Sequence, residues 1–126
     1  KNIEIIEDED ILARAARAAH RFQEGLASLS DLPIVGDVRG HTLIGCVENV
    51  ADRATGRPFD EDIDIGRRVS DAAEARGVMV RPLGALNVMS PALVISDDEI
   101  DKIVTGLRGA IRDVTDALVR EGVRIG

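Results

Sequence analysis

A long apolar stripe near the end of the chain constrains the fold more than any other feature. Ser96-Asp97-Asp98-Glu99 has the spacing of a capping box, in which the serine side chain bonds the amide of Glu99 and the glutamate reaches back to the serine amide. This pattern predicts a long amphipathic helix that ends near Glu121-Gly122 and buries one face. The apolar residues of that face recur every three or four positions: Ile100, Ile103, Val104, Leu107, Ile111, Val114 and Leu118.

Two earlier segments show helical periodicity as well. Ile3 to about Ser30 is predicted to be helical, with Asp8 as the cap of its main part. A second helix is predicted from about Ile63 to Arg76, with Gly77 as its terminator. The apolar face of the earlier helix consists of Ile11, Ala15, Ala18, Phe22, Leu26 and Leu29.

Segments rich in β-forming residues lie between the predicted helices. Ile34 to Val50 predicts a short strand, a turn near Arg39-Gly40 and a longer strand. Val78 to Val80 and Asn87 to Met89 predict two short strands, and Leu93 to Ile95 can extend the second of them. The order helix, strand, strand, helix, strand, strand, helix predicts one α+β domain over residues 1–126. Its small, mostly antiparallel sheet is covered by helices.

The composition argues against several classes of function. The chain has 126 residues, a net charge of −7 and a hydrophobic content of 44%. Nucleic-acid binding needs a concentrated positive field, and a membrane span needs about 20 consecutive apolar residues, so we expect neither partner. Cys46 is the single cysteine, which leaves no internal disulfide and favours a cytoplasmic protein over a secreted one.

Motifs of common active sites are absent from the sequence. It holds no phosphate-binding glycine loop, no nucleophile elbow and no metal-ligand spacing, so we expect no catalytic, cofactor-binding or metal-binding residue. His20 is predicted to be a solvated helix residue, and His41 lies in a predicted turn without a visible partner. Cys46 is predicted to be a buried small hydrophobe. The acids of 60–64 (Asp60, Glu61, Asp62 and Asp64) and the pair Arg67-Arg68 are predicted to face solvent.

Arg81 is the one residue whose setting suggests binding. It follows the apolar run Val78 to Val80 and precedes Pro82-Leu83-Gly84, so its backbone is held at the end of a predicted strand. A guanidinium with a fixed origin binds a carboxylate through two parallel hydrogen bonds. A structural ion pair or a capped carbonyl explains the same pattern, and the residues alone leave both interpretations open.

Several motifs taken together resemble one family. Their order and spacing resemble the carboxy-terminal part of class III, pyridoxal-phosphate-dependent aminotransferases of the omega-amino-acid:pyruvate type. Lys1 to Glu7 resembles the stretch where that family leaves its large domain, and the chain has no initiator methionine, so we expect a fragment of a longer protein. The motifs are 32–40, 47–48, 51–53, 57–59, 76–78, 81–84, 90–93 and 100–103.

The resemblance implies an aminotransferase, of which this chain supplies only one domain. It implies the small domain of a fold-type I enzyme, whose absent large domain holds pyridoxal phosphate on a lysine, so no cofactor is expected on this chain. Arg81 matches the mobile arginine that binds the substrate carboxylate. The implied partners are the protein's own large domain, small amines and keto acids, and a second subunit of a homodimeric parent. We expect the chain alone to be inactive.

A second interpretation stays open at this point. A free-standing acidic α+β module that binds a small carboxylate or a protein partner has the same composition and periodicity. An upstream reading frame that encodes a cofactor lysine would distinguish the two.

Overall fold

The computed structural model describes residues 1–126 and contains four α-helices and four strands. The helices are α1 (Asn2–Asp8), α2 (Ile11–Ala27), α3 (Ile65–Glu74) and α4 (Asp97–Arg120). The strands are β1 (Val35–His41), β2 (Ile44–Asn49), β3 (Arg81–Leu83) and β4 (Leu86–Met89). Two 3₁₀ turns, η1 (Ser28–Asp31) and η2 (Glu61–Ile63), follow α2 and precede α3. The predicted order of elements is confirmed, except that the first helix is divided into two.

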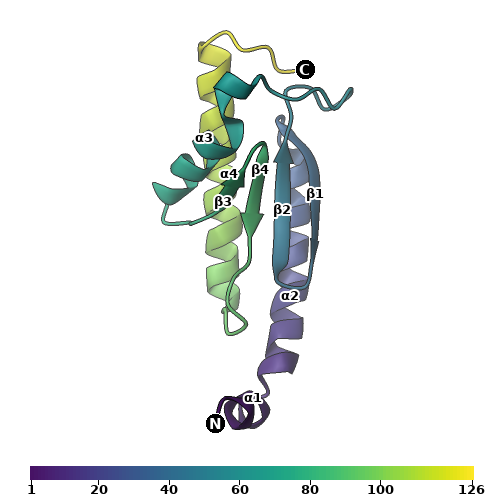
Figure 1. Ribbon diagram of the computed structural model, residues 1–126, viewed down its shortest axis with the longest axis vertical. Coiled ribbons are helices and arrows are strands. Elements are labelled where there is room, and N and C mark those ends of the chain that lie inside the picture. The colour runs from purple at the N-terminus through teal and green to yellow at the C-terminus, as the bar shows by residue number, and fades with distance from the viewer.

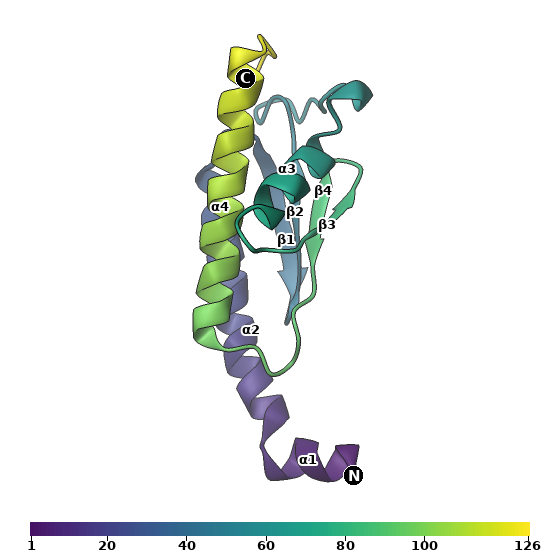
Figure 2. The same ribbon diagram turned by 90° about the vertical axis from the view of Figure 1, so that its left-hand side faces the viewer.

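The sheet is antiparallel throughout, with the strand order β1-β2-β4-β3. Helix α2 packs on β1 and β2, α3 packs on β3 and β4, and α4 packs across α2 and α3. Figures 1 and 2 show these helices on one face of the sheet and no helix on the other. The predicted α+β class, a small antiparallel sheet covered by helices, is therefore confirmed. None of the helices is both long enough and apolar enough to cross a bilayer.

The core lies between the sheet and the helices. Along β2, Val47 and Asn49 are fully buried, whereas Ile44 is 57% exposed, as expected when successive side chains point to opposite faces. Gly45 lies so close to α2 that a Cβ atom there would be 2.1 Å from Cδ1 of Leu26. The predicted apolar stripes supply many of the largest fully buried side chains of the core: Phe22 and Leu26 of α2, Leu29 of η1, and Ile100, Leu107, Ile111 and Leu118 of α4.

The predicted helical segment from Ile3 to about Ser30 is confirmed except for a break at Asp10 and a final 3₁₀ turn. Asp10 has the left-handed backbone conformation (φ 49°), which ends the first helix and begins the second in a new direction. Asp10, and not Asp8, occupies the N-cap position of α2, and its side chain makes no capping hydrogen bond. Helix α1 has no buried residue, so no core packing aligns it with α2.

The predicted turn near Arg39-Gly40 is also misplaced. Strand β1 continues to His41, and Gly40 pairs with Gly45 of β2. The reversal falls at Thr42-Leu43, where Thr42 has φ 51°. The local propensity of Gly40 favours a turn, but its pairing with β2 keeps it within the strand.

In the second strand pair the predicted strand Asn87 to Met89 is confirmed as part of β4, whereas its partner is shifted along the chain. Val78 to Val80 forms no strand; Val78 and Val80 are buried and Met79 is 88% exposed. This segment returns from Gly77 (φ 78°), and its first amide donates to the carbonyl of Ala73 at the end of α3. The strand β3 begins only at Arg81, and Leu93 to Ile95 does not extend β4. Val78 and Val80 pack against α3 and are not paired with another strand. The β propensity of these residues does not predict this tertiary contact.

The capping box of α4 is confirmed. The Glu99 amide donates to Ser96 Oγ over 3.3 Å, and the Ser96 amide donates to Glu99 Oε2 over 2.8 Å. Hydrogen bonds from the Ser96 amide and then from its side chain hold the pKa of Glu99 below its ordinary value.

We expect Ser96→Ala to lower the free energy of unfolding by about 1 kcal/mol, because the Glu99 amide loses its acceptor. Chemical denaturation measures this loss, and Ser90→Ala, at an exposed serine in a loop, is the control.

Because the pKa of Glu99 is lower in the folded state, its carboxylate stabilises the fold above the ordinary pKa. This stabilisation disappears as the pH falls through the folded pKa. The stability difference between the wild type and Glu99→Gln should shrink in that acid range.

Candidate functional site on the open face of the sheet

The face of the sheet without helices carries one row of side chains across all four strands. Arg39 pairs with Cys46, Cys46 with Val88, and Val88 with Arg81. Residues directly opposite in antiparallel strands point to the same face, so these four side chains share the open face. Three strand spacings separate the two arginine backbones, which is ~14 Å.

Arg39, at one end of the row, is already neutralised. Its Nη1 donates to Asp37 Oδ2 over 2.5 Å and to Glu48 Oε2 over 2.7 Å. These two carboxylates raise the pKa of the Arg39 guanidinium above its ordinary value, the hydrogen bond to Glu48 being the largest cause. The cluster leaves little positive charge on this side of the open face.

Arg81, at the other end of the row, is exposed and unpaired. It is the first residue of β3, and its guanidinium makes neither a hydrogen bond nor an ion pair with the rest of the chain. The structure therefore shows neither of the two structural explanations that the sequence left open, an ion pair or a capped carbonyl. An exposed guanidinium without partners is free to donate hydrogen bonds to an external carboxylate.

The backbone that carries Arg81 is held from the covered side of the sheet. The Ser70 hydroxyl on α3 donates to the carbonyl of Val80 over 2.8 Å, one residue before the arginine. Asn87, paired with Pro82 and fully buried, donates from Nδ2 to the carbonyl of Gly66 over 2.9 Å. A Cβ atom at Gly66 would lie 2.1 Å from the Gly84 carbonyl oxygen, so the first turn of α3 lies directly on the β3–β4 hairpin.

A buried amide pair extends this framework to β2. Asn49 Nδ2 donates to Asn87 Oδ1 and to the Ala85 carbonyl, each over 2.8 Å. Asn49 Oδ1 has no partner within the chain. The pair links the two central strands through side chains as well as through the backbone ladder.

Cys46 lies on the open face and not in the core, contrary to the prediction of a buried side chain. The alternation along β2 directs Gly45 and Val47 inward, which places the thiol on the other side, half-buried and free of any disulfide. Partial burial raises the pKa of the thiol, and the Arg39 guanidinium opposes this shift.

The remaining candidate residues lie apart from the open face or make structural contacts. His20 is exposed and lies 3.4 Å from Glu24, and His41 is exposed at the end of β1. Arg67 is exposed as predicted, but Arg68 is not. It is 28% exposed and pairs with Glu121 over 2.6 Å, because α3 packs beside the end of α4. No group of three or more His, Cys, Asp or Glu side chains is arranged to hold a metal ion.

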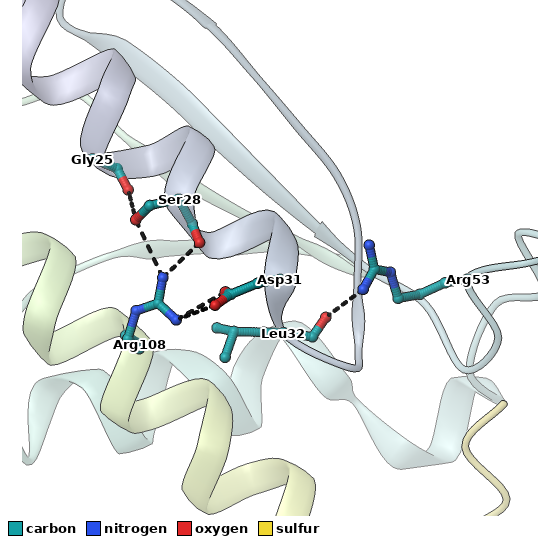
Figure 3. Close-up of polar contacts among 6 residues, drawn as sticks. All are labelled: Gly25, Ser28, Asp31, Leu32, Arg53 and Arg108. Carbon is teal, nitrogen blue, oxygen red and sulfur yellow. Dashed lines mark hydrogen bonds and ion pairs between the residues drawn. The ribbon is translucent and has the colours of Figure 1, made fainter.

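A second arginine cluster, which the sequence analysis missed, holds the end of α2 (Figure 3). Arg108 of α4 donates to Asp31 Oδ1 over 2.8 Å and to the Ser28 carbonyl over 2.5 Å. Arg53 approaches the Leu32 carbonyl from the other side, at 3.5 Å. The partners of Arg108 lie 77 and 80 residues away in sequence, so no local signal identifies them. Both arginines bind groups of the chain itself, which makes this cluster structural.

The chain is similar to known transaminases both in fold and in sequence. Two solved structures superimpose on 93% of the chain: a transaminase with L-alanine (TM-score 0.88, 33% identity) and a sixfold mutant of a thermostable omega transaminase from Pseudomonas jessenii (TM-score 0.87, 32% identity). The fold, with its one-sided sheet, is therefore that of a transaminase domain. The aminotransferase class-III family model matches residues 1–111. The chain belongs to the class-III aminotransferase family, and it corresponds to the carboxy-terminal part of these proteins.

Curated relatives agree with this assignment. An uncharacterized aminotransferase of Sinorhizobium fredii is 40% identical over 98% of the chain, which spans 27% of that protein. The diaminobutyrate–2-oxoglutarate transaminase of Halomonas elongata is 38% identical over 96% of the chain, which spans 26% of it. The chain also spans 28% and 26% of the two solved structures. It therefore accounts for about a quarter of the length of the proteins that it matches.

Proposed function

We propose that residues 1–126 form the carboxy-terminal small domain of a class III aminotransferase that moves an amino group from an amine or omega-amino acid to a keto acid such as pyruvate. In this proposal Arg81 binds the carboxylate of the substrate and the chain contributes one wall of the active site. The observation that carries the proposal is an exposed, unpaired arginine on the open sheet face of a class III domain.

The cofactor belongs, in this proposal, to the other three quarters of the enzyme. Class III aminotransferases in general depend on pyridoxal phosphate, which is held as a Schiff base on a lysine. The two lysines of this chain, Lys1 and Lys102, are both exposed, whereas a Schiff-base lysine needs a desolvated pocket. The residues present do not fit the cofactor, so we derive no catalytic step from them.

The open face is also the surface that we expect to meet the large domain. Besides Arg81 it carries Ile44 and Leu83, which are 57% and 60% exposed, and the half-buried Leu86 and Val88. Apolar side chains gathered on one face favour burial against another part of the protein. Family membership disfavours the alternative of a free-standing binding module. A homodimeric parent and a cytoplasmic location remain predictions.

The proposal that the cofactor is held by the other part of the enzyme is tested with the chain alone. We expect no transfer of an amino group to pyruvate when the purified chain is mixed with pyridoxal phosphate and an amine. Borohydride reduction followed by peptide mapping should show only scattered surface labelling. Stoichiometric labelling of Lys102 together with turnover would contradict the proposal.

Cys46 reports on whether the open face is covered. In the chain alone its thiol is half-buried with a raised pKa, so alkylation near neutral pH should be slower than for a small free thiol. In the full-length enzyme we expect alkylation to slow by a further ~10-fold or more, because the large domain excludes the reagent. The control is the same pair of measurements after partial denaturation, which should bring the two rates together. Equal rates in the native chain and the native enzyme would show that the open face stays uncovered.

A further inference from the structure

We propose that Ser70 is a positioning residue for Arg81, a role that rests on the proposed function. The serine lies on α3, on the covered side of the sheet, and is only 9% exposed. Its hydroxyl donates to the Val80 carbonyl over 2.8 Å. This bond fixes the peptide unit that joins Val80 to Arg81, and therefore the backbone position from which the guanidinium projects.

The geometry of α3 makes this bond unusual for a helical serine. A serine inside a helix commonly directs its hydroxyl to the carbonyl four residues earlier in its own helix. Ser70 instead reaches to the returning segment, ten residues further along the chain. No backbone amide outside the helices and strands donates to the same carbonyl. Without the hydroxyl, the carbonyl of a buried residue would lose its donor.

Apart from the burial of the Val78 and Val80 side chains, the segment before Arg81 has few polar restraints. Val78 to Val80 belongs to no strand, so the sheet ladder begins to hold the chain only at Arg81 itself. The segment is anchored at its start by the amide of Val78, which donates to the Ala73 carbonyl over 2.9 Å. At its end the polar anchor is the Ser70 hydroxyl. A carboxylate clamp depends on the placement of its guanidinium, because displacements of about 1 Å reduce the rate severely.

The test compares Ser70→Ala with Arg81→Ala in the full-length enzyme. We expect Ser70→Ala to lower kcat/KM roughly 10-fold in the half-reaction with pyruvate and to leave the half-reaction with a plain amine unchanged. If Ser70 acts through Arg81, adding Ser70→Ala to Arg81→Ala should produce no further loss with pyruvate. The matched control is Thr115→Val, which removes a hydroxyl that donates to a carbonyl over 2.7 Å within α4, away from β3.

Hydrogen exchange in the chain alone supplies a readout that does not depend on turnover. Ser70→Ala should speed exchange at the amides of Val78, which donates to the Ala73 carbonyl, and of Arg81, which is paired with Val88, more than at those of α4, whereas Thr115→Val should not. Unchanged exchange at these amides, or equal slowing of both half-reactions, would overturn the role of Ser70. If Arg81→Ala itself spares the pyruvate half-reaction, the proposed function fails. A carboxylate-specific loss in Arg81→Ala but not in Ser70→Ala leaves the function standing and removes only this inference.

Discussion

Arg81→Ala in the full-length enzyme should lower kcat/KM by about 30- to 1000-fold in the half-reaction with pyruvate, equivalent to about 2–4 kcal/mol of transition-state binding. The reason is the loss of the charge-assisted, two-pronged contact that we propose between Arg81 and the acceptor carboxylate. The half-reaction with a benzylic amine should change little, because that donor has no carboxylate. Single-turnover kinetics followed by cofactor absorbance measure the two halves separately.

Two further variants sharpen this result. Arg81→Lys retains the charge but loses the planar fork, so we expect a smaller but clear loss with pyruvate. Arg67→Ala removes an exposed arginine of α3 that pairs only with Asp71 of the same helix, and it should leave both halves unchanged. Equal slowing of both halves by Arg81→Ala would show that the arginine supports the fold and not the substrate.

Leu26→Ala should lower the free energy of unfolding by about 2–5 kcal/mol, which is the largest effect that we expect on stability. Leu26 is fully buried, and its Cδ1 atom fills the space above Gly45 on the inner face of β2. Because a glycine cannot fill the gap, the truncated side chain leaves a cavity between α2 and the sheet. Urea denaturation monitored by circular dichroism measures the loss.

Leu12 provides a matched control on the same helix. It is also a leucine of α2, but it is 66% exposed, so Leu12→Ala should change the stability by less than about 0.5 kcal/mol. Similar losses in both variants would mean that α2 does not pack on the sheet as described.

Local signals predicted the helices of this domain better than its strands. The capping box at Ser96 and the stripe that follows it lie in one continuous segment, so α4 was predicted with its correct start and end. The turn after β1 was misplaced because Gly40 is paired with Gly45, and this pairing depends on a neighbouring strand. The left-handed Asp10 carries no sequence signature of its own, so the break between α1 and α2 was missed.

Features of the candidate site that depend on contacts distant in sequence were likewise not predicted. Arg81 stands out in the sequence because proline and glycine follow it and because its motif resembles a known family. Its exposure and its lack of partners emerge only from the structure. Ser70 gives no local signal, since its acceptor is brought to it by the return of the chain beneath α3. Neither the ion pairs of Arg39 nor the outward position of Cys46 follows from composition, because both depend on the register of β1 and β2.

The one-sided arrangement of helices has a consequence for which positions of the sheet tolerate substitution. Side chains that fill the core and side chains of the open face occupy opposite surfaces of the same strands, as the alternating burial along β2 shows. A substitution at Ile44, Val88 or Arg81 therefore opens no cavity beneath the helices and removes no core contact. Successive exchanges on this surface can therefore accumulate while the thermodynamic stability of the domain stays nearly constant, and under the proposed function such exchanges would alter substrate preference.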